Sequence, residues 1–437
     1  MKAKQRNIIY ASGVASQNIL YNFMSMYIMF FFTDLLHIDA KAATFIIVAA
    51  SIWDAVNDLM MGALVDNTKT KIGKFRPYIL SGAVFIFITT VLCFTFFNTK
   101  ANITVLISGA AYILWGMSYT VVDIPLWALS SSISNDKEEK NQMITMGKIG
   151  GTLGVVICVL LSIKVLDLFG GTSSIKAFTY TSILVGFIAF IGILLIGLFI
   201  KEGNVKISRV KLKDNIKVVT KNKVLINLLL CLFVINTIAG IRQAAQIYFT
   251  IYTWGSESYV TLLGAALVVG MVIGMAASPY LIKKYEKKLI MIYSSLFGAV
   301  VNFVPYININ SAPLGLVSIC FSFASLGVLS ITSMAMLLDA IDYSEYLFGF
   351  RSEGIVFSLN TFATKLSAAF ARLILGLTLV LINYESGQAI SKTTVSAFSA
   401  LMYLIPSLAC ILTIVILYKY KLDRNTMASV EEKLKRN

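Results

Sequence analysis

Charged side chains are scarce in this sequence. Only 14% of its 437 residues are Asp, Glu, Lys or Arg, and it contains one histidine, His37. It also carries no cluster of metal ligands, no Gly-rich phosphate loop and no nucleophile motif. We therefore expect no enzyme, no catalytic residue and no bound cofactor. The five cysteines all fall inside apolar runs, which predicts packing residues rather than a disulfide framework.

Apolar residues are what the sequence has in abundance. They make up 57% of the chain, and the mean hydropathy is +0.80. A membrane-spanning helix needs about 20 predominantly apolar residues. Such runs lie at 8–36, 42–65, 78–97, 103–130, 143–166, 177–200, 224–253, 258–281, 289–305, 314–338, 354–382 and 397–418. The sequence therefore predicts an all-α polytopic membrane protein with twelve transmembrane helices. A cleavable signal peptide is not expected, because the first run is too long.

The net charge of +15 is distributed unevenly along the chain. Most Lys and Arg lie in alternate loops and near both ends of the sequence. This bias is typical of the cytoplasmic side of a membrane protein. We therefore expect both termini in the cytoplasm, and a lipid bilayer rather than nucleic acid as the partner of this charge.

A basic segment separates the apolar runs into two sets of six. The expected organisation is an N-terminal six-helix bundle (1–200), a cytoplasmic linker (201–223), a C-terminal six-helix bundle (224–420) and a cytoplasmic tail (421–437). The acidic stretch 339–346 is predicted to form a cytoplasmic turn, where its acids could pair with basic loops of the other bundle.

Asp54, Asn57 and Asp58 lie in the middle of the second apolar run. Their i, i+3, i+4 spacing places all three on one face of a helix. A carboxylate at the centre of a membrane helix costs roughly 2.5–3.5 kcal/mol on insertion scales. Two of them on one face require a cation, a proton or a basic partner. The spacing favours a coupling-ion site, and a structural ion-pair network is the alternative.

The fourth run carries a second polar face. Tyr119, Asp123 and Trp127 are spaced by four residues, and Thr120 lies three before Asp123. A carboxylate beside an indole suits a sugar, because the acid binds hydroxyls and the ring covers C–H faces. Lys148, on the next run, lies at a similar depth. It could pair with Asp123 or bind one ligand jointly with it.

Several motifs resemble those of the glycoside–pentoside–hexuronide:cation symporters, and the similarity to the melibiose permease type covers nearly the whole chain. The matching segments are 27–34, 53–58, 73–77, 112–127, 342–346 and 361–365. A loop with Gly62, Asp66, Gly73, Lys74 and Arg76 also looks like one that many transporters of the major facilitator superfamily carry. The resemblance implies the major facilitator fold, in which two six-helix bundles enclose the substrate.

The resemblance also implies roles for individual residues. A site for sodium, lithium or a proton is expected at Asp54, Asn57, Asp58 and Thr120, with the two aspartates as metal ligands if the ion is sodium. The sugar contacts on the fourth helix are expected to be Tyr119, Asp123 and Trp127. Further substrate contacts are expected on the eleventh helix, at Asn360, Thr361, Thr364 and Lys365, and Lys365 could instead neutralise one of the aspartates.

The sequence departs from the melibiose type at several positions. Gln17-Asn18 stands where that type has Lys-Asp, which makes Asn18 a candidate substrate residue. Lys148 replaces an arginine and cannot form its bidentate fork. Arg242 and Arg372 are additional cations inside apolar runs, so we predict that both bind a carboxylated sugar such as a hexuronate or glucuronide. Anchoring of Arg242 to backbone carbonyls is the alternative.

Together these features predict a secondary active transporter. It is expected to move a glycoside, pentoside or hexuronide with Na⁺ or H⁺ by alternating access, as a monomer in the cytoplasmic (inner) membrane of a bacterium. Two alternatives remain open: an uncoupled or exchanging sugar carrier in which the acids are structural, and a membrane sensor that does not transport.

Overall fold

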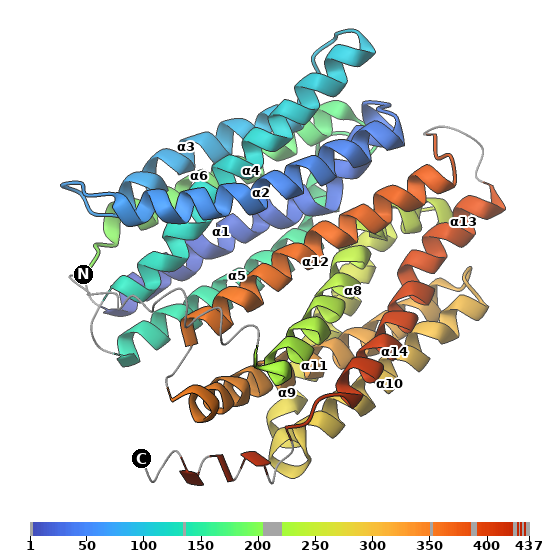
Figure 1. The fold of residues 1–437 in the computed structure, drawn as a ribbon. Coiled ribbons are helices and arrows are strands. Elements are labelled where there is room, and N and C mark those ends of the chain that lie inside the picture. Colours follow the sequence, from blue (N-terminus) through green and yellow to red (C-terminus); the bar gives the residue numbers. More distant parts are fainter. Residues whose placement is uncertain are drawn as a thin grey trace. The chain divides into compact units, whose positions relative to one another are not determined.

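The structure is a computed structural model that describes residues 3–133, 137–203, 221–349, 353–385, 391–422, 426–427, 429–430 and 432–433. These residues form helices joined by short connections and contain no β-strand (Figure 1). The elements are α1 (Ala3–Phe30), η1 (Phe31–Leu35), α2 (Ala40–Asn67), α3 (Arg76–Cys93), α4 (Ala101–Ser132), α5 (Lys137–Leu168), α6 (Ile175–Phe199), α8 (Lys223–Trp254), α9 (Ser258–Lys284), α10 (Lys287–Ile307), α11 (Ala312–Phe348), α12 (Glu353–Leu381), α13 (Lys392–Ser399), η2 (Ala400–Leu404) and α14 (Ile405–Tyr418).

Two short π-helical turns, η1 and η2, explain why the structure has more helical elements than the twelve predicted transmembrane helices. The turn η1 continues α1, and η2 joins α13 to α14 without a break. The described residues therefore contain twelve long helical segments. This confirms the predicted all-α membrane fold.

Ten of the described helices are long and apolar enough to cross a membrane. The helices α1 and α2 fall outside this group. Their interiors carry the polar residues Gln17 and Asn18 on α1 and Asp54, Asn57 and Asp58 on α2. Polar groups at membrane depth are expensive and mark functional positions. The candidate site thus draws polar residues from the interiors of both helices.

By its contacts the chain divides into two units. Unit 1 comprises residues 1–207 and 376–389, and unit 2 comprises residues 208–375 and 390–437. Within unit 1, α1 packs on α5 and α6, α3 on α4 and α6, and α2 on α4. Within unit 2, α11 packs on α9 and α10, and α14 on α8 and α10. The predicted linker and tail lie largely outside the described residues, so their boundaries stay predictions.

Glycines allow α1 to approach α5 closely. A Cβ at Gly150 would overlap the carbonyl oxygen of Ala11, and one at Gly154 would overlap that of Ala15. The two backbones are therefore in direct contact, as in other small-residue interfaces of membrane helices. This contact holds α1 and its polar residue Gln17 in place inside unit 1.

The stretch 339–346 is helical, so the predicted turn there is wrong. The helix α11 continues past the apolar run to Phe348 and ends where Gly349 adopts the left-handed conformation, with φ 74°. The Asp339 carboxylate binds the Lys287 ammonium at 2.7 Å. Because Lys287 begins α10, this ion pair joins two helices of unit 2.

The N-terminus of α3 is closed by the carboxylate of Glu202, which follows α6. It accepts hydrogen bonds from the backbone N–H groups of Lys74 (2.7 Å), Phe75 (2.6 Å) and Arg76 (3.1 Å). A helix N-terminus offers unpaired N–H groups and a positive dipole end, both of which favour an anion. Gly73 has φ 118°, and a Cβ there would overlap this carboxylate.

The side chain of Arg76 makes a second connection to α6. Its Nε donates to the Gly197 carbonyl at 2.7 Å, and its Nη2 donates to the Leu198 carbonyl at 3.0 Å. The family-like loop therefore joins the start of α3 to the end of α6 within unit 1.

Glu202→Gln is expected to lower the stability of the protein. The change removes the charge from a group that accepts three backbone hydrogen bonds, and loss of an N-terminal cap costs about 1 kcal/mol. A lower melting temperature of the purified protein in detergent is the expected readout. Glu286→Gln is the matched control, because Glu286 precedes α10 but its side chain makes no capping hydrogen bond. Equal melting temperatures for both variants would contradict this role of Glu202.

Candidate functional site

The first polar cluster of unit 1 lies between α2 and α4. The Thr120 hydroxyl on α4 donates to Asp58 Oδ1 on α2 at 3.0 Å. One turn earlier on α4, Gly116 faces Asp54 so closely that a Cβ there would overlap the Asp54 carboxylate. The structure thus brings both predicted aspartates against the predicted threonine helix.

Asn57 completes this cluster on the α2 face. It is 8% exposed, and its Nδ2 atom has no hydrogen-bond partner among the described residues. An amide, a hydroxyl and two carboxylates offer the hard oxygen ligands that small cations prefer. The described residues contain no group of three or more His, Cys, Asp or Glu that could hold a metal ion. Because these donors are oxygen atoms and include neither thiolate nor imidazole, the set suits a small hard cation or a proton better than a transition metal.

The second polar cluster is centred on Asp123 of α4. Gln17 Nε2 on α1 donates to Asp123 Oδ1 at 2.9 Å. Tyr119, one turn earlier on α4, lies on the same face of the helix as Asp123. Trp127 lies one turn further on and packs edge-on against Tyr10, with ring centroids 6.4 Å apart. Carboxylate, amide, phenol and indole on neighbouring helices can bind the hydroxyls and ring face of a sugar.

The helix α4 links the two clusters through consecutive residues. Thr120 donates to Asp58 of the first cluster, whereas its neighbours Tyr119 and Asp123 belong to the second. A displacement of α4 caused by a ligand at one cluster would therefore move groups of the other.

An aromatic stack supports the Tyr119 side of α4. The Tyr21 ring lies 5.0 Å from that of Tyr119 and 6.3 Å from that of Trp115. The Trp115 indole is held by a hydrogen bond from Nε1 to the Thr90 hydroxyl at 3.1 Å. These ring contacts restrict the orientation of the Tyr119 side chain.

Two predicted substrate residues of unit 1, Asn18 and Lys148, have surroundings that differ from those of the Asp123 cluster. The Asn18 amide donates to the Val14 carbonyl of its own helix at 2.9 Å, and its side chain packs against Gly151 of α5. The Lys148 side chain is exposed and forms no ion pair with the described residues. The direct Asp123–Lys148 pair is therefore not formed. Joint binding of a ligand by these two residues stays a prediction.

Arg242 of α8 is buried in unit 2, with 2% of its surface exposed. Its Nε donates to the Met402 carbonyl at 3.1 Å, its Nη1 donates to the Ser322 hydroxyl at 2.7 Å, and its Nη2 donates to Asn302 Oδ1. The guanidinium carbon also lies 5.5 Å from the centroid of the Phe323 ring. These contacts include the carbonyl anchor considered above, and substrate binding by Arg242 stays a prediction.

The remaining candidates lie on α12. The Thr361 and Thr364 hydroxyls donate to backbone carbonyls one turn earlier, and Thr364 lies 3.4 Å from Asn236 Nδ2 of α8. Asn360, Lys365 and Arg372 also lie on α12 and are partly exposed. All belong to unit 2, so a role for Lys365 beside Asp54 or Asp58 stays a prediction.

Sequence reasoning missed Gln17, Gly116 and Asn302 as contact residues. Gln17 and Asn302 are polar residues in apolar runs, and their depth alone could have flagged them. For Gly116 no such signal exists, because its role follows from how closely α4 approaches Asp54.

Comparisons with known proteins agree with the fold. The sequence model of the family described as "MFS/sugar transport protein" matches residues 9–424. The isoprimeverose transporter of Lactiplantibacillus pentosus is 26% identical, over 95% of this chain and 89% of the relative. A protein of Escherichia coli (strain K12) provisionally named as a sulfoquinovose importer is also 26% identical, over 98% of this chain and 93% of the relative.

Solved structures show the same fold. The inward-open xylose transporter XylE from E. coli aligns with a TM-score of 0.70 at 11% identity, over 99% of both chains. A D-xylose–proton symporter aligns with a TM-score of 0.69 at 13% identity, over 95% of this chain and 98% of the other.

Proposed function

Because this chain belongs to the MFS/sugar transport protein family and, within it, to the glycoside–pentoside–hexuronide type, we propose that it carries a sugar or glycoside together with Na⁺, Li⁺ or H⁺. The observation that carries the proposal is the pair of polar clusters joined by α4. One cluster, around Asp54 and Asp58, has the ligands for a cation. The other, around Asp123, has the ligands for a sugar.

Coupling follows from thermodynamic linkage between the clusters. A cation bound by Asp54 and Asp58 would fix the position of Thr120, and through α4 that of Tyr119 and Asp123. This would stabilise the arrangement in which Gln17 orients Asp123 toward sugar hydroxyls. The sugar must then raise the affinity for the cation by the same factor. Alternating access of the two helix bundles around the loaded site would complete transport.

The substrate class is proposed from the chemistry of the site and from the relatives. Isoprimeverose is a glycoside, and sulfoquinovose is a sugar with a sulfonate group. Asp123, Gln17 and Trp127 suit the hydroxyls and ring of either. The exposed Lys148 could pair with a carboxylate or sulfonate. We propose a glycoside as the substrate, and an anionic group on it as the more specific alternative.

Competition assays distinguish the two. If the substrate is anionic, hexuronates or glucuronides inhibit uptake more strongly than matched neutral sugars, and Lys148→Ala removes that preference. Lys164→Ala is the control, because Lys164 is also exposed and lies on the same helix. Arg242→Ala is a poorer probe, since it removes three internal hydrogen bonds. A preference for neutral sugars that Lys148→Ala leaves unchanged would exclude the anionic substrate but not sugar transport.

Uptake into membrane vesicles tests the proposed function as a whole. Vesicles from cells that produce the protein should accumulate a labelled sugar when a Na⁺ or H⁺ gradient is imposed. Exchange that ignores every gradient would indicate an uncoupled carrier, and absence of both uptake and exchange would favour a sensor. The proposed location is the cytoplasmic membrane of a bacterium, with both termini in the cytoplasm. The proposed functional unit is a monomer.

Gly116→Ala is expected to weaken the cation dependence of transport. The added Cβ would overlap the Asp54 carboxylate and displace it. A loss of about 1.4 kcal/mol in cation binding corresponds to a tenfold higher half-saturating cation concentration. Gly62→Ala is the matched control, because a Cβ on Gly62 of α2 meets no atom within 4 Å. The assignment fails if both variants keep the wild-type cation dependence.

A further inference from the structure

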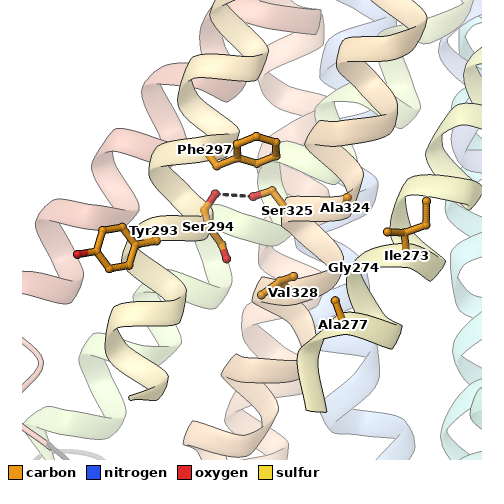
Figure 2. Close-up of a pocket in the computed structure, with 9 residues that line it drawn as sticks. All are labelled: Ile273, Gly274, Ala277, Tyr293, Ser294, Phe297, Ala324, Ser325 and Val328. Carbon is orange, nitrogen blue, oxygen red and sulfur yellow. Dashed lines mark hydrogen bonds between the residues drawn. The ribbon is translucent and has the colours of Figure 1, made fainter. Parts of the chain in front are cut away.

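A groove lies between α9 and α10 of unit 2, with α11 as its floor (Figure 2). It has a volume of about 280 Å³ and is lined by Ile273, Gly274, Ala277, Tyr293, Ser294, Phe297, Ala324, Ser325 and Val328. The Ser325 hydroxyl donates to the Ser294 carbonyl at 2.6 Å. Because this donor is used inside the protein, the groove presents a mainly apolar surface.

Small residues create the groove. A Cβ at Gly274 would overlap the Ala324 carbonyl oxygen, so α9 and α11 are in backbone contact. The helix α10 is joined to α11 by the Ser325–Ser294 hydrogen bond. Helices α9 and α10 both pack on α11 but touch each other little. The space between them stays open because Ala277 and Ala324 are too short to fill it.

The rim of the groove is exposed and apolar. Ile273 is 55% exposed and Phe297 is 46% exposed, and both α9 and α10 are apolar enough to cross a membrane. In a membrane, such a surface would face lipid chains.

Positively charged side chains lie beyond one end of the groove. The helix α9 ends with Lys283 and Lys284, and α10 begins at Lys287. Lys287 is bound to Asp339 at 2.7 Å, whereas Lys283 and Lys284 are exposed. Ala277 in the groove lies about 9 Å along α9 from Lys283 at 1.5 Å per residue. A molecule with an anionic head and a long apolar tail matches both features.

Exposed tyrosines place these lysines at the level of lipid headgroups. Tyr280, near the end of α9, is 66% exposed, and Tyr285, between the two helices, is 49% exposed. Tyrosine is enriched at the membrane–water interface because its ring is apolar and its hydroxyl is polar. The Lys284 ammonium lies 5.4 Å from the centroid of the Tyr285 ring, which keeps this charge beside the interface.

We propose that the groove binds one anionic phospholipid of the bilayer. Its acyl chain lies between α9 and α10, and its phosphate contacts Lys283 and Lys284. A second copy of the chain fits less well, because a symmetric contact through this face would bring two lysine pairs together. A zwitterionic lipid could fill the groove but would add no net negative charge at the lysines.

Native mass spectrometry of the full-length protein in detergent tests the proposal. Phosphatidylglycerol and phosphatidylcholine with identical acyl chains are titrated separately, and the fraction carrying one lipid is measured. Phosphatidylglycerol should bind more tightly. Replacing Lys283 and Lys284 by Ala together should lower its affinity about fivefold per lysine, roughly 1 kcal/mol each. The same double replacement at Lys69 and Lys71, two exposed lysines of unit 1, should have little effect.

A second variant tests the groove itself. Ala277→Trp fills the groove and should prevent binding of one phosphatidylglycerol, while Ala276→Trp, at an exposed position beside it, should not. If Ala277→Trp does not fold, the double replacement of Lys283 and Lys284 tests the proposal by itself. Equal binding of both lipids by the wild type, or unchanged binding after loss of Lys283 and Lys284, would overturn the proposal. So would a dimer that Ala277→Trp disrupts.

Discussion

Asp58→Cys is expected to abolish gradient-driven accumulation of sugar. The change removes a carboxylate that accepts a hydrogen bond from Thr120 at 3.0 Å and, in the proposed mechanism, binds the coupling ion. Without a bound cation the gradient cannot drive transport, so the internal sugar concentration should not exceed the external one. The Asp123 cluster keeps its residues, so sugar exchange across the membrane should continue. Accumulation and exchange of labelled sugar in vesicles measure these two activities separately.

The control for this experiment is a carboxylate elsewhere in unit 1. Asp167 lies near the end of α5 and is exposed, so Asp167→Cys makes the same chemical change away from the clusters and should accumulate sugar normally. Asp54→Cys should behave like Asp58→Cys, because Gly116 holds Asp54 against the same helix. Normal accumulation in both the Asp54 and Asp58 variants would remove the basis for a cation site on α2.

Asp123→Asn is expected to impair binding of the sugar itself. Asp123 accepts a hydrogen bond from Gln17 at 2.9 Å, which orients its carboxylate. A hydrogen bond to a charged group contributes about 1.5–3 kcal/mol, so the loss of one such bond to a sugar hydroxyl lowers affinity by roughly tenfold or more. Both accumulation and exchange should therefore fall, unlike in the Asp58 variant. Sugar affinity of the purified protein provides the direct measurement.

Gln17→Leu tests how much the orientation of the Asp123 carboxylate, as distinct from its charge, contributes to sugar binding. It removes the hydrogen bond to Asp123 Oδ1 but leaves the carboxylate, so its effect on affinity should be smaller than that of Asp123→Asn. Asp167→Asn again controls for a general effect of a lost surface charge. If Asp123→Asn binds sugar like the wild type, the sugar site lies elsewhere.

Helical periodicity and the cost of buried charge predicted much of this architecture. The i, i+3, i+4 spacing of Asp54, Asn57 and Asp58 placed them on one face before any contact was known. The spacing of Tyr119 and Asp123 likewise predicted a common face. The contact between Thr120 and Asp58 could not be obtained from spacing, because it joins residues 62 positions apart, and it entered through the family resemblance.

Other features depend on packing that sequence patterns do not encode. The acids at 339–346 suggested a turn, because charged residues usually mark the end of a membrane span. Instead the helix continues, and Asp339 is neutralised by Lys287. The Glu202 cap on α3 joins residues 126 positions apart or more. Three of the N–H groups of Arg242 donate to Met402, Ser322 and Asn302, a network that only the folded unit 2 assembles.

The dependence of sugar affinity on cation concentration tests the central claim most directly. Sugar binding to the purified protein is measured by calorimetry over a range of Na⁺, Li⁺ and H⁺ concentrations, for the wild type and for Asp58→Cys. The account predicts that at least one cation strengthens sugar binding to the wild type, that the sugar strengthens binding of that cation by the same factor, and that Asp58→Cys loses both effects. A wild-type sugar affinity that is constant at every concentration of all three cations would contradict it.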